Sequence, residues 1–232
     1  AITSVSESLK KETLKTFKID NKITVIPNFI NIKEYNIVRE HCVKSRYAPN
    51  GERIIVHISN FRKVKRVDDV VRVFAEVQKK LPARLILVGD GPEKANIETM
   101  VRKLGLHHEV IMAGKVTDPK ELLSIADLFI LPSETESFGL AALEAMAMRV
   151  PVISTNSGGL PELNVNGTTG YLSNVGDVVD MASNAMKILG NNETLEVFRK
   201  QAFEHALKFD IEKILPQYEK LYNQLLHKEM VG

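Results

Sequence analysis

The sequence has no tryptophan and a single cysteine, Cys42, among its 232 residues. One cysteine cannot form a disulfide within the chain, so we expect a reducing, cytoplasmic environment. No apolar run reaches the roughly 18 residues that a membrane span needs, and no signal segment opens the chain. Neither sign of charge dominates, because 31 basic and 29 acidic residues leave a formal net charge of +2. This balance argues against nucleic acid or an acidic membrane as a partner.

Several ligand-binding motifs are also missing. The sequence contains no G-x-G-x-x-G, which argues against a nicotinamide or flavin enzyme, and no G-x-x-x-x-G-K-[ST], which argues against an ATPase. It has no Asp-x-Asp pair to hold a divalent metal on a diphosphate. His107 and His108 are adjacent, which suits a turn better than a metal site, and His57 is expected in the core or a crevice. We therefore expect no cofactor and no metal.

The composition, 44% hydrophobic and 26% charged, is that of an ordinary globular protein. Short apolar runs rich in Val and Ile alternate with amphipathic helical stretches, and most runs lack period-two alternation. This pattern predicts an α/β fold, a Rossmann-like doubly wound parallel sheet buried on both faces. The predicted strands are residues 23–26, 53–59, 84–89, 110–113, 128–131, 152–155 and 170–172. The predicted helices are 67–80, 93–104, 119–126, 140–148, 178–189, 193–208 and 211–228.

The two ends of the chain carry further signals. Residues 1–6 are typical of the end of a buried strand, and Ser6 then caps a helix. Because the chain begins inside a strand and without Met, we expect sequence missing upstream; the alternative is a short native terminus after Met removal. Residues 25–50, with Pro27 and Pro49, are interpreted as a linker. The last helix has an apolar stripe that requires a partner surface.

In an open parallel sheet, ligands bind beyond the carboxyl ends of the strands where the strand order reverses. For a doubly wound sheet, the first and fourth core strands flank that crevice. The first is followed by residues 59–66, SNFRKVKR, whose cations are Arg62, Lys63, Lys65 and Arg66. Cations at such a turn suit a diphosphate. The alternative is a solvated loop.

The fourth core strand is followed by residues 132–140, PSETESFGL, which run into a small-residue helix. Gly139 permits close backbone approach, and the free amides of the helix start suit an anion. Glu136 and Glu144 lie about two helical turns apart, so they can reach different parts of one long ligand. Alternatively, Glu134 and Glu136 cap the helix, favoured by the helix dipole, and Glu144 lies on the surface. The apolar neighbours of Glu144 argue against that alternative, since a carboxylate there needs a partner.

Two glycine turns complete the candidate site. Residues 89–92, GDGP, follow the second core strand, and residues 157–162, SGGLPE, follow the fifth. Each turn either brings backbone close to a ligand or simply satisfies turn geometry. The residues leave both alternatives open.

These motifs together resemble the C-terminal domain of retaining family 4 glycosyltransferases, which have the two-domain GT-B fold. The resemblance covers nearly the whole chain. It rests on the E-x7-E signature from Glu136 to Glu144, the hinge at 25–28, the turns at 89–92 and 158–162, and the final helix. It implies four parts: residues 1–24 as a remnant of the acceptor domain, 25–50 as the linker, 51–208 as the nucleotide-sugar-binding domain, and 209–232 as a helix crossing back onto the first domain.

The first loop departs from the usual family pattern of Gly-Arg followed by Lys-Gly. Asn60 stands where the arginine is expected, Lys65 keeps the lysine position, and Arg62 is a candidate for the missing guanidinium. The variant resembles the branch that transfers N-acetylglucosamine from UDP-N-acetylglucosamine to L-malate in bacillithiol synthesis. The implied partners are therefore a UDP-sugar and a small hydroxy acid, without a metal. The apolar stripe of the last helix suits either the absent domain or a second subunit, so a homo-oligomer is left open.

The resemblance also implies roles for single residues. Lys65 and Arg62 would neutralise the diphosphate, Glu136 would bind sugar hydroxyls, and Glu144 would accept from the ribose. The departing phosphate is expected to deprotonate the acceptor, so stabilising its charge is the main catalytic task. The remaining donor-binding residues implied are Asn60, Gly89, Lys115 and Val116 beside the base, and Ser137, Phe138, Gly139 and Leu140, of which the last three contribute backbone amides.

Three other functions fit parts of the pattern. The first is a transferase of the same family with another sugar or acceptor. The second is a UDP-sugar epimerase of similar fold, which would need no acceptor. The third is a non-catalytic nucleotide-sugar-binding domain. We expect this chain alone to bind the donor weakly and to transfer nothing.

Overall fold

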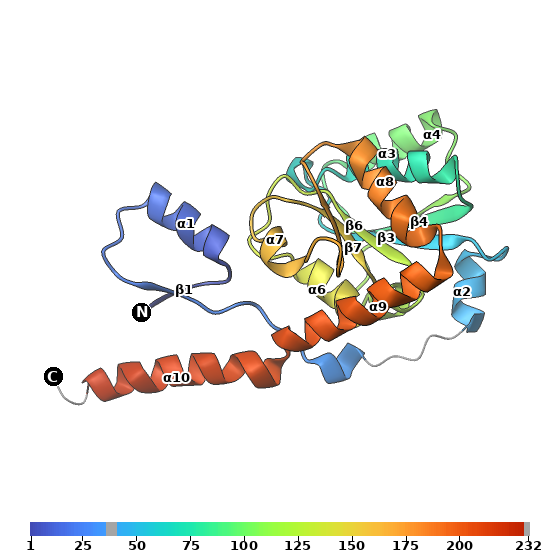
Figure 1. Ribbon diagram of the computed structural model, residues 1–232. Coiled ribbons are helices and arrows are strands. Elements are labelled where there is room, and N and C mark those ends of the chain that lie inside the picture. The colour runs from blue at the N-terminus through green and yellow to red at the C-terminus, as the bar shows by residue number, and fades with distance from the viewer. Residues whose placement is uncertain (36–40, 230–232) are drawn as a thin grey trace.

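The computed structural model describes residues 1–35 and 41–229. Residues 36–40 of the predicted linker, residues 230–232 of the predicted C-terminal part 209–232, and the side chain of Cys42 lie outside this description. The runs rich in Val and Ile form one six-stranded sheet in which all neighbouring strands are parallel (Figure 1). Its strands are β3 (Arg53–Ile58), β4 (Ala83–Val88), β5 (Val110–Gly114), β6 (Leu128–Leu131), β7 (Val152–Thr155) and β8 (Gly170–Ser173).

The strand order places the reversal point where the sequence predicted it. The order is β5-β4-β3-β6-β7-β8, so the chain builds outward from β3 on one side and returns to its other side with β6. Ile55 pairs with Leu128 and Val56 with Phe129 across this junction. The loops after β3 and β6 therefore lie next to each other at the carboxyl edge of the sheet.

Both faces of the sheet are buried, which explains the lack of alternation in the strand sequences. Successive residues of β3 enter different cores: Ile54 and Val56 join one cluster, while Ile55 joins the other. The first cluster is covered by α5 (Lys120–Ser124), α6 (Leu140–Ala147) and α7 (Leu160–Leu163). The second is covered by α3 (Val67–Gln78), α4 (Lys94–Lys103) and α8 (Val178–Leu189), and α9 (Asn192–Ala206) contributes to both. The predicted doubly wound fold is confirmed.

The expected helices are all present, with ends shifted by a few residues. Two helices were not predicted, α2 (His41–Tyr47) inside the supposed linker and the four-residue α7. Both are short, and neither shows a helical period long enough to stand out in the sequence. The linker also contains a 3-10 turn at Ile32–Tyr35, which brings Tyr35 to the main domain.

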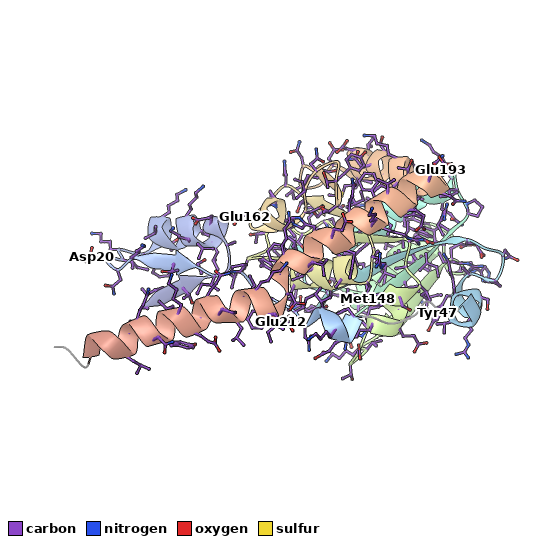
Figure 2. The ribbon with its side chains drawn as sticks, turned by 60° about the horizontal axis from the view of Figure 1, so that its bottom comes forward. Asp20, Tyr47, Met148, Glu162, Glu193 and Glu212 are labelled. Atoms are coloured by element: carbon purple, nitrogen blue, oxygen red, sulfur yellow. The ribbon has the colours of Figure 1, made fainter. Side chains whose placement is uncertain are left out.

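The N-terminal residues form a separate small unit. β1 (Ile2–Ser4) pairs in parallel with β2 (Ile23–Val25), and α1 (Glu7–Thr16) lies between them in sequence. Ser6 caps α1 as predicted, because its hydroxyl oxygen accepts from the amide of Leu9 at 3.0 Å. The last helix, α10 (Ile211–Glu229), leaves the main domain and runs along the same side as this unit (Figures 1 and 2).

A cluster of polar contacts ties α1 to the main domain. The carboxylate of Glu162 accepts hydrogen bonds from the amides of Glu7 and Ser8, each at 2.8 Å. The hydroxyl of Ser6 donates to the carbonyl oxygen of Ser137 at 2.6 Å. Glu162 lies on the side of the main domain that faces α1 (Figure 2). The free amides of the first turn of α1 are thus satisfied by a residue more than 150 positions away in sequence.

At the amino ends of the strands, opposite the carboxyl edge described above, the buried carboxylate of Asp127 joins three elements. It accepts from the amide of Ile54 at 2.8 Å and pairs with Lys44 at 2.8 Å and with Arg199. Its side chain is fully buried, so its charge depends on these partners. Asp127 therefore fastens α2 and α9 to the start of β3.

Within the described residues, no helix combines the length and apolar character needed to cross a membrane.

Replacing Asp127 with asparagine is expected to destabilise the fold by roughly 3 kcal/mol, because Lys44 and Arg199 lose their shared counter-charge. Urea unfolding of Asp127→Asn and the wild type measures the difference. The matched control is Glu204→Gln, which removes the partner of exposed Lys200 and should change the free energy of unfolding by less than about 0.5 kcal/mol. Equal losses in the two variants would contradict the assignment.

Glu162→Ala is expected to raise hydrogen exchange at the amides of Glu7 and Ser8 by about tenfold or more, since charged hydrogen bonds of this kind hold them. Exchange followed by NMR measures this. Glu193→Ala, at the opposite end of the main domain in Figure 2, is the control and should leave these amides unchanged. Unaltered exchange in Glu162→Ala would show that the contact does not hold α1.

Candidate functional site

The loop after β3 is shaped by the glycine turn that follows β4. Phe61 is completely buried and anchors the loop, and its amide donates to the carbonyl of Asp90 at 2.9 Å. A Cβ on Gly89 would lie 1.8 Å from the carbonyl oxygen of Ser59, and one on Gly91 would lie 2.6 Å from that of Phe61. The glycines at 89–92 therefore allow two loops to touch, and Gly89 serves this packing.

The loop after β6 is braced in the same way by the turn after β7. The amide of Gly159 donates to the carbonyl of Glu136 at 2.7 Å, and a Cβ on Gly158 would lie 2.3 Å from that same oxygen. Gly139, with φ of 98°, opens α6 in the left-handed region, and no side chain caps the helix. The cap residue therefore supplies no side-chain acceptor to the first-turn amides of α6.

Between the two loops lies a cavity of about 410 Å³, here called the central pocket. Glu136 and Glu144 both line it, which confirms that the two carboxylates share one cleft. Lys65 lines it from the other loop. The complete lining is Ile58, Ser59, Asn60, Lys65, Leu131, Glu136, Gly139, Leu140, Ala141 and Glu144. The site thus combines a cation, two carboxylates and a helix start at the reversal point of the sheet.

Lys65 and Glu136 form an ion pair in this pocket. The ammonium donates to the carboxylate at 2.6 Å, and both side chains are largely buried. The hydroxyl of Ser133 donates to the same carboxylate oxygen at 2.9 Å. Neither Glu136 nor Glu134 caps α6: Glu134 pairs with Arg66 at 3.2 Å instead. The interpretation of these glutamates as helix caps is therefore wrong.

A second cavity, of about 500 Å³, opens on the other side of this ion pair and is called the outer pocket. Lys65 and Glu136 line both pockets, so the ion pair separates them. The far wall of the outer pocket is α1 and the residue after it. Its other lining residues are Leu9, Glu12, Thr13, Thr16, Phe17, Val64, Thr135 and Ser137.

Glu144 has a polar partner, Tyr35, as expected for a carboxylate with apolar neighbours. The hydroxyl of Tyr35 donates to its carboxylate at 3.3 Å. Burial raises the pKa of Glu144, against the effects of Tyr35 and Lys120. Burial and the neighbouring Glu144 charge together raise the pKa of Tyr35 well above its usual value, so the phenol remains a donor. Tyr35 and Glu144 also line a smaller cavity with residues 117–120, which extends the site beyond the central pocket.

His57 is buried in β3, as predicted, and lies behind the pocket. Its Nδ1 is 2.8 Å from the carbonyl oxygen of Ile130, and its Nε2 is 2.7 Å from the hydroxyl of Ser59. The pKa of His57 is lowered to about 4, mainly by burial and also by the charge of Lys65, against the opposing effect of the hydrogen bond to Ile130. The ring is therefore neutral at physiological pH.

The structure does not bring every predicted site residue into the central pocket. Arg62 is exposed and lines a different cavity with Lys63 and Arg66, whereas Lys65 lines the central pocket. Lys115 and Val116 are exposed after β5 and do not line the central pocket. The side chain of Phe138 is buried and packs edge-on against Phe209, which leaves only its backbone for a ligand.

Sequence reasoning missed three polar residues of the site. Ser59 and Ser133 follow β3 and β6, and a polar residue directly after a buried strand was the available signal. Tyr35 could not be found, because it belongs to the linker and reaches Glu144 across 109 positions. No local pattern encodes a contact over that distance.

Comparison with known proteins identifies what this site resembles. The sequence profile of the family described as "Glycosyl transferases group 1" matches residues 39–205. N-acetyl-alpha-D-glucosaminyl L-malate synthase from Bacillus anthracis is 42% identical over 100% of this chain and 61% of its own length. The 2-deoxystreptamine N-acetyl-D-glucosaminyltransferase of Niallia circulans is 29% identical over 88% of this chain and 54% of its own length.

A solved structure shows the same fold. TarM from S. aureus, in a mutant form crystallised with fondaparinux, alpha-GlcNAc-glycerol and UDP, superposes with a TM-score of 0.83 at 26% identity. The match covers 96% of this chain and 44% of TarM. This chain thus spans less than two thirds of the length of each of these proteins.

Glu144→Gln is expected to stabilise the protein at pH 7. Burial raises the pKa of Glu144 above that of the unfolded chain, so the native state binds this proton more tightly and loses stability as pH rises through the native pKa. The neutral amide avoids that loss. Urea unfolding at pH 7 should show a higher midpoint than the wild type, and the difference should vanish at pH 4.

Glu193→Gln changes an exposed carboxylate and should alter neither midpoint. A lower midpoint for Glu144→Gln at pH 7 would contradict the reasoning, since it would mean that the ionised carboxylate is stabilised where it lies.

Proposed function

This chain belongs to the glycosyl transferases group 1 family, and from that membership we propose that it supplies the donor-binding half of a retaining glycosyltransferase. The proposed donor is UDP-N-acetylglucosamine and the proposed acceptor is L-malate, as in the first step of bacillithiol synthesis. The observation that carries the proposal is the convergence of Lys65, Glu136 and Glu144 on one pocket at the reversal point of the sheet.

Lys65 is the proposed contact for the diphosphate. Phosphate oxygens in the central pocket compete with Glu136 for its ammonium group, and the amides that begin α6 offer them further donors. Glu136, released from Lys65, can then accept from hydroxyls of the sugar. Arg62 lines another cavity and would have to change its side-chain conformation to take part.

Glu144 is the proposed contact for the ribose. Its carboxylate can accept from two neighbouring hydroxyls while Tyr35 holds one of its oxygens. The cavity lined by Tyr35 and residues 117–120 continues the central pocket past Glu144, so it offers room for the base. This extends the predicted base position near Lys115 and Val116 by a few residues along the same loop.

In the proposed reaction the bond between the anomeric carbon and the diphosphate oxygen breaks, and a bond to the acceptor hydroxyl forms on the same face. The departing phosphate takes the hydroxyl proton. The task of this chain is then to stabilise negative charge on the leaving group, which Lys65 and the amides of α6 can do. No cofactor enters this scheme.

Donor and acceptor are proposed from the relatives. Both curated relatives are named for N-acetylglucosamine, and only the first for L-malate. The whole enzyme would include an acceptor site that lies at least partly outside the pockets described here. The alternative is a transferase of the same family with another sugar or acceptor, and assay of the whole enzyme against a panel of both would distinguish them.

Calorimetry with UDP tests the proposal. The chain should bind UDP, and Lys65→Ala should weaken binding by roughly tenfold to a hundredfold, because a charge-assisted contact to the diphosphate is lost. Lys63→Ala is the matched control: it removes the same charge two residues away, from a side chain that lines another cavity, and should leave affinity within about threefold.

Two outcomes would count against the proposed function. One is no heat of binding at millimolar UDP. The other is equal weakening by Lys63→Ala and Lys65→Ala, which would indicate a diffuse electrostatic effect of the loop and no defined diphosphate contact.

A further inference from the structure

The contacts of His57 determine where its proton lies. A carbonyl oxygen can only accept, so Nδ1 at 2.8 Å from the Ile130 carbonyl must carry the hydrogen. The ring is completely buried and neutral, so Nε2 has no hydrogen and must accept. The hydroxyl of Ser59, 2.7 Å from Nε2, is therefore the donor of that hydrogen bond.

This arrangement fixes the character of the Ser59 hydroxyl. Its one hydrogen is committed to His57, so only its lone pairs remain for other partners. The backbone around it is also fixed, because the Ser59 amide donates to the Val88 carbonyl at 3.1 Å and Gly89 packs against its carbonyl. Ser59 is partly exposed and lines the central pocket. The pocket thus presents a neutral hydroxyl that can accept but not donate.

We propose that Ser59 is a specificity-determining residue of the central pocket, whose oxygen accepts a hydrogen bond from an N–H or O–H group of the bound nucleotide sugar. This inference rests on the proposed function and adds to it. His57 acts through Ser59 and is a positioning residue.

The proposal also orients the ligand. Lys65 and the amides that begin α6 are donors, so they suit phosphate oxygens. Ser59 has no hydrogen to offer a phosphate, and its lone pairs repel one. The diphosphate therefore lies toward Lys65 and α6, and Ser59 meets a donor-bearing part of the ligand, either the nucleoside or the sugar.

Calorimetry of Ser59→Ala with UDP, UDP-glucose and UDP-N-acetylglucosamine tests this. Loss of the acceptor should weaken binding of at least one ligand by roughly fivefold to thirtyfold. Ser59→Thr keeps the hydroxyl and should restore most of the affinity. Ser124→Ala is the control, since that buried hydroxyl donates to the Glu121 carbonyl, away from the pocket, and should leave all three affinities unchanged.

The three ligands identify the donor group. Weaker binding of UDP itself places it on the nucleoside. Weaker binding of both sugar nucleotides, with UDP unaffected, places it on a sugar hydroxyl. A loss confined to UDP-N-acetylglucosamine assigns it to the acetamido N–H. Each of these results supports the proposal. Wild-type binding of UDP with no change of any affinity in Ser59→Ala overturns this inference alone, whereas failure of the wild type to bind UDP overturns both it and the proposed function.

Nitrogen NMR of the His57 ring gives a readout that does not depend on affinity. The ring should be neutral at pH 7 with its hydrogen on Nδ1, and the Nε2 resonance should shift in Ser59→Ala because its donor is gone. A hydrogen on Nε2 would overturn the proposal, since Ser59 would then be free to donate into the pocket.

Discussion

Burial of the sheet on both faces is the constraint from which the site follows. Residues of β3 enter one core or the other in turn, so the strand has no exposed face on which polar chemistry can sit. Polar side chains therefore gather at the strand ends. Because the strand order reverses between β3 and β6, the loops after these two strands meet there, and both are rich in charge.

Close backbone packing turns these two loops into a defined site. Gly89 and Gly91 hold the first loop, Gly158 and Gly159 hold the second, and in each case a side chain would collide with the neighbouring backbone. Lys65 and Glu136 then face each other at 2.6 Å. The packing of these glycine turns supports the residues that line the pocket.

The site is coupled to the rest of the chain through its second loop. The carbonyl of Ser137 accepts from Ser6, and α7, which follows the second glycine turn, supplies Glu162 to the start of α1. The outer pocket lies between α1 and the Lys65–Glu136 pair. Movement of α1 relative to the main domain would therefore alter one wall of the site directly.

The sequence alone determined the order of strands and long helices along the chain and the two loops that carry the chemistry. It also placed Glu136 and Glu144 in one cleft. These features depend on local periodicity and fixed spacing. It could not determine that Arg62 and Lys65 line different cavities, since successive residues of a loop have no period that assigns them a side. Nor could it reveal the contacts of Tyr35 with Glu144, of Glu162 with α1, or of His57 with Ile130. These join positions far apart in the chain, and only the packing of the folded chain brings such partners within hydrogen-bonding distance.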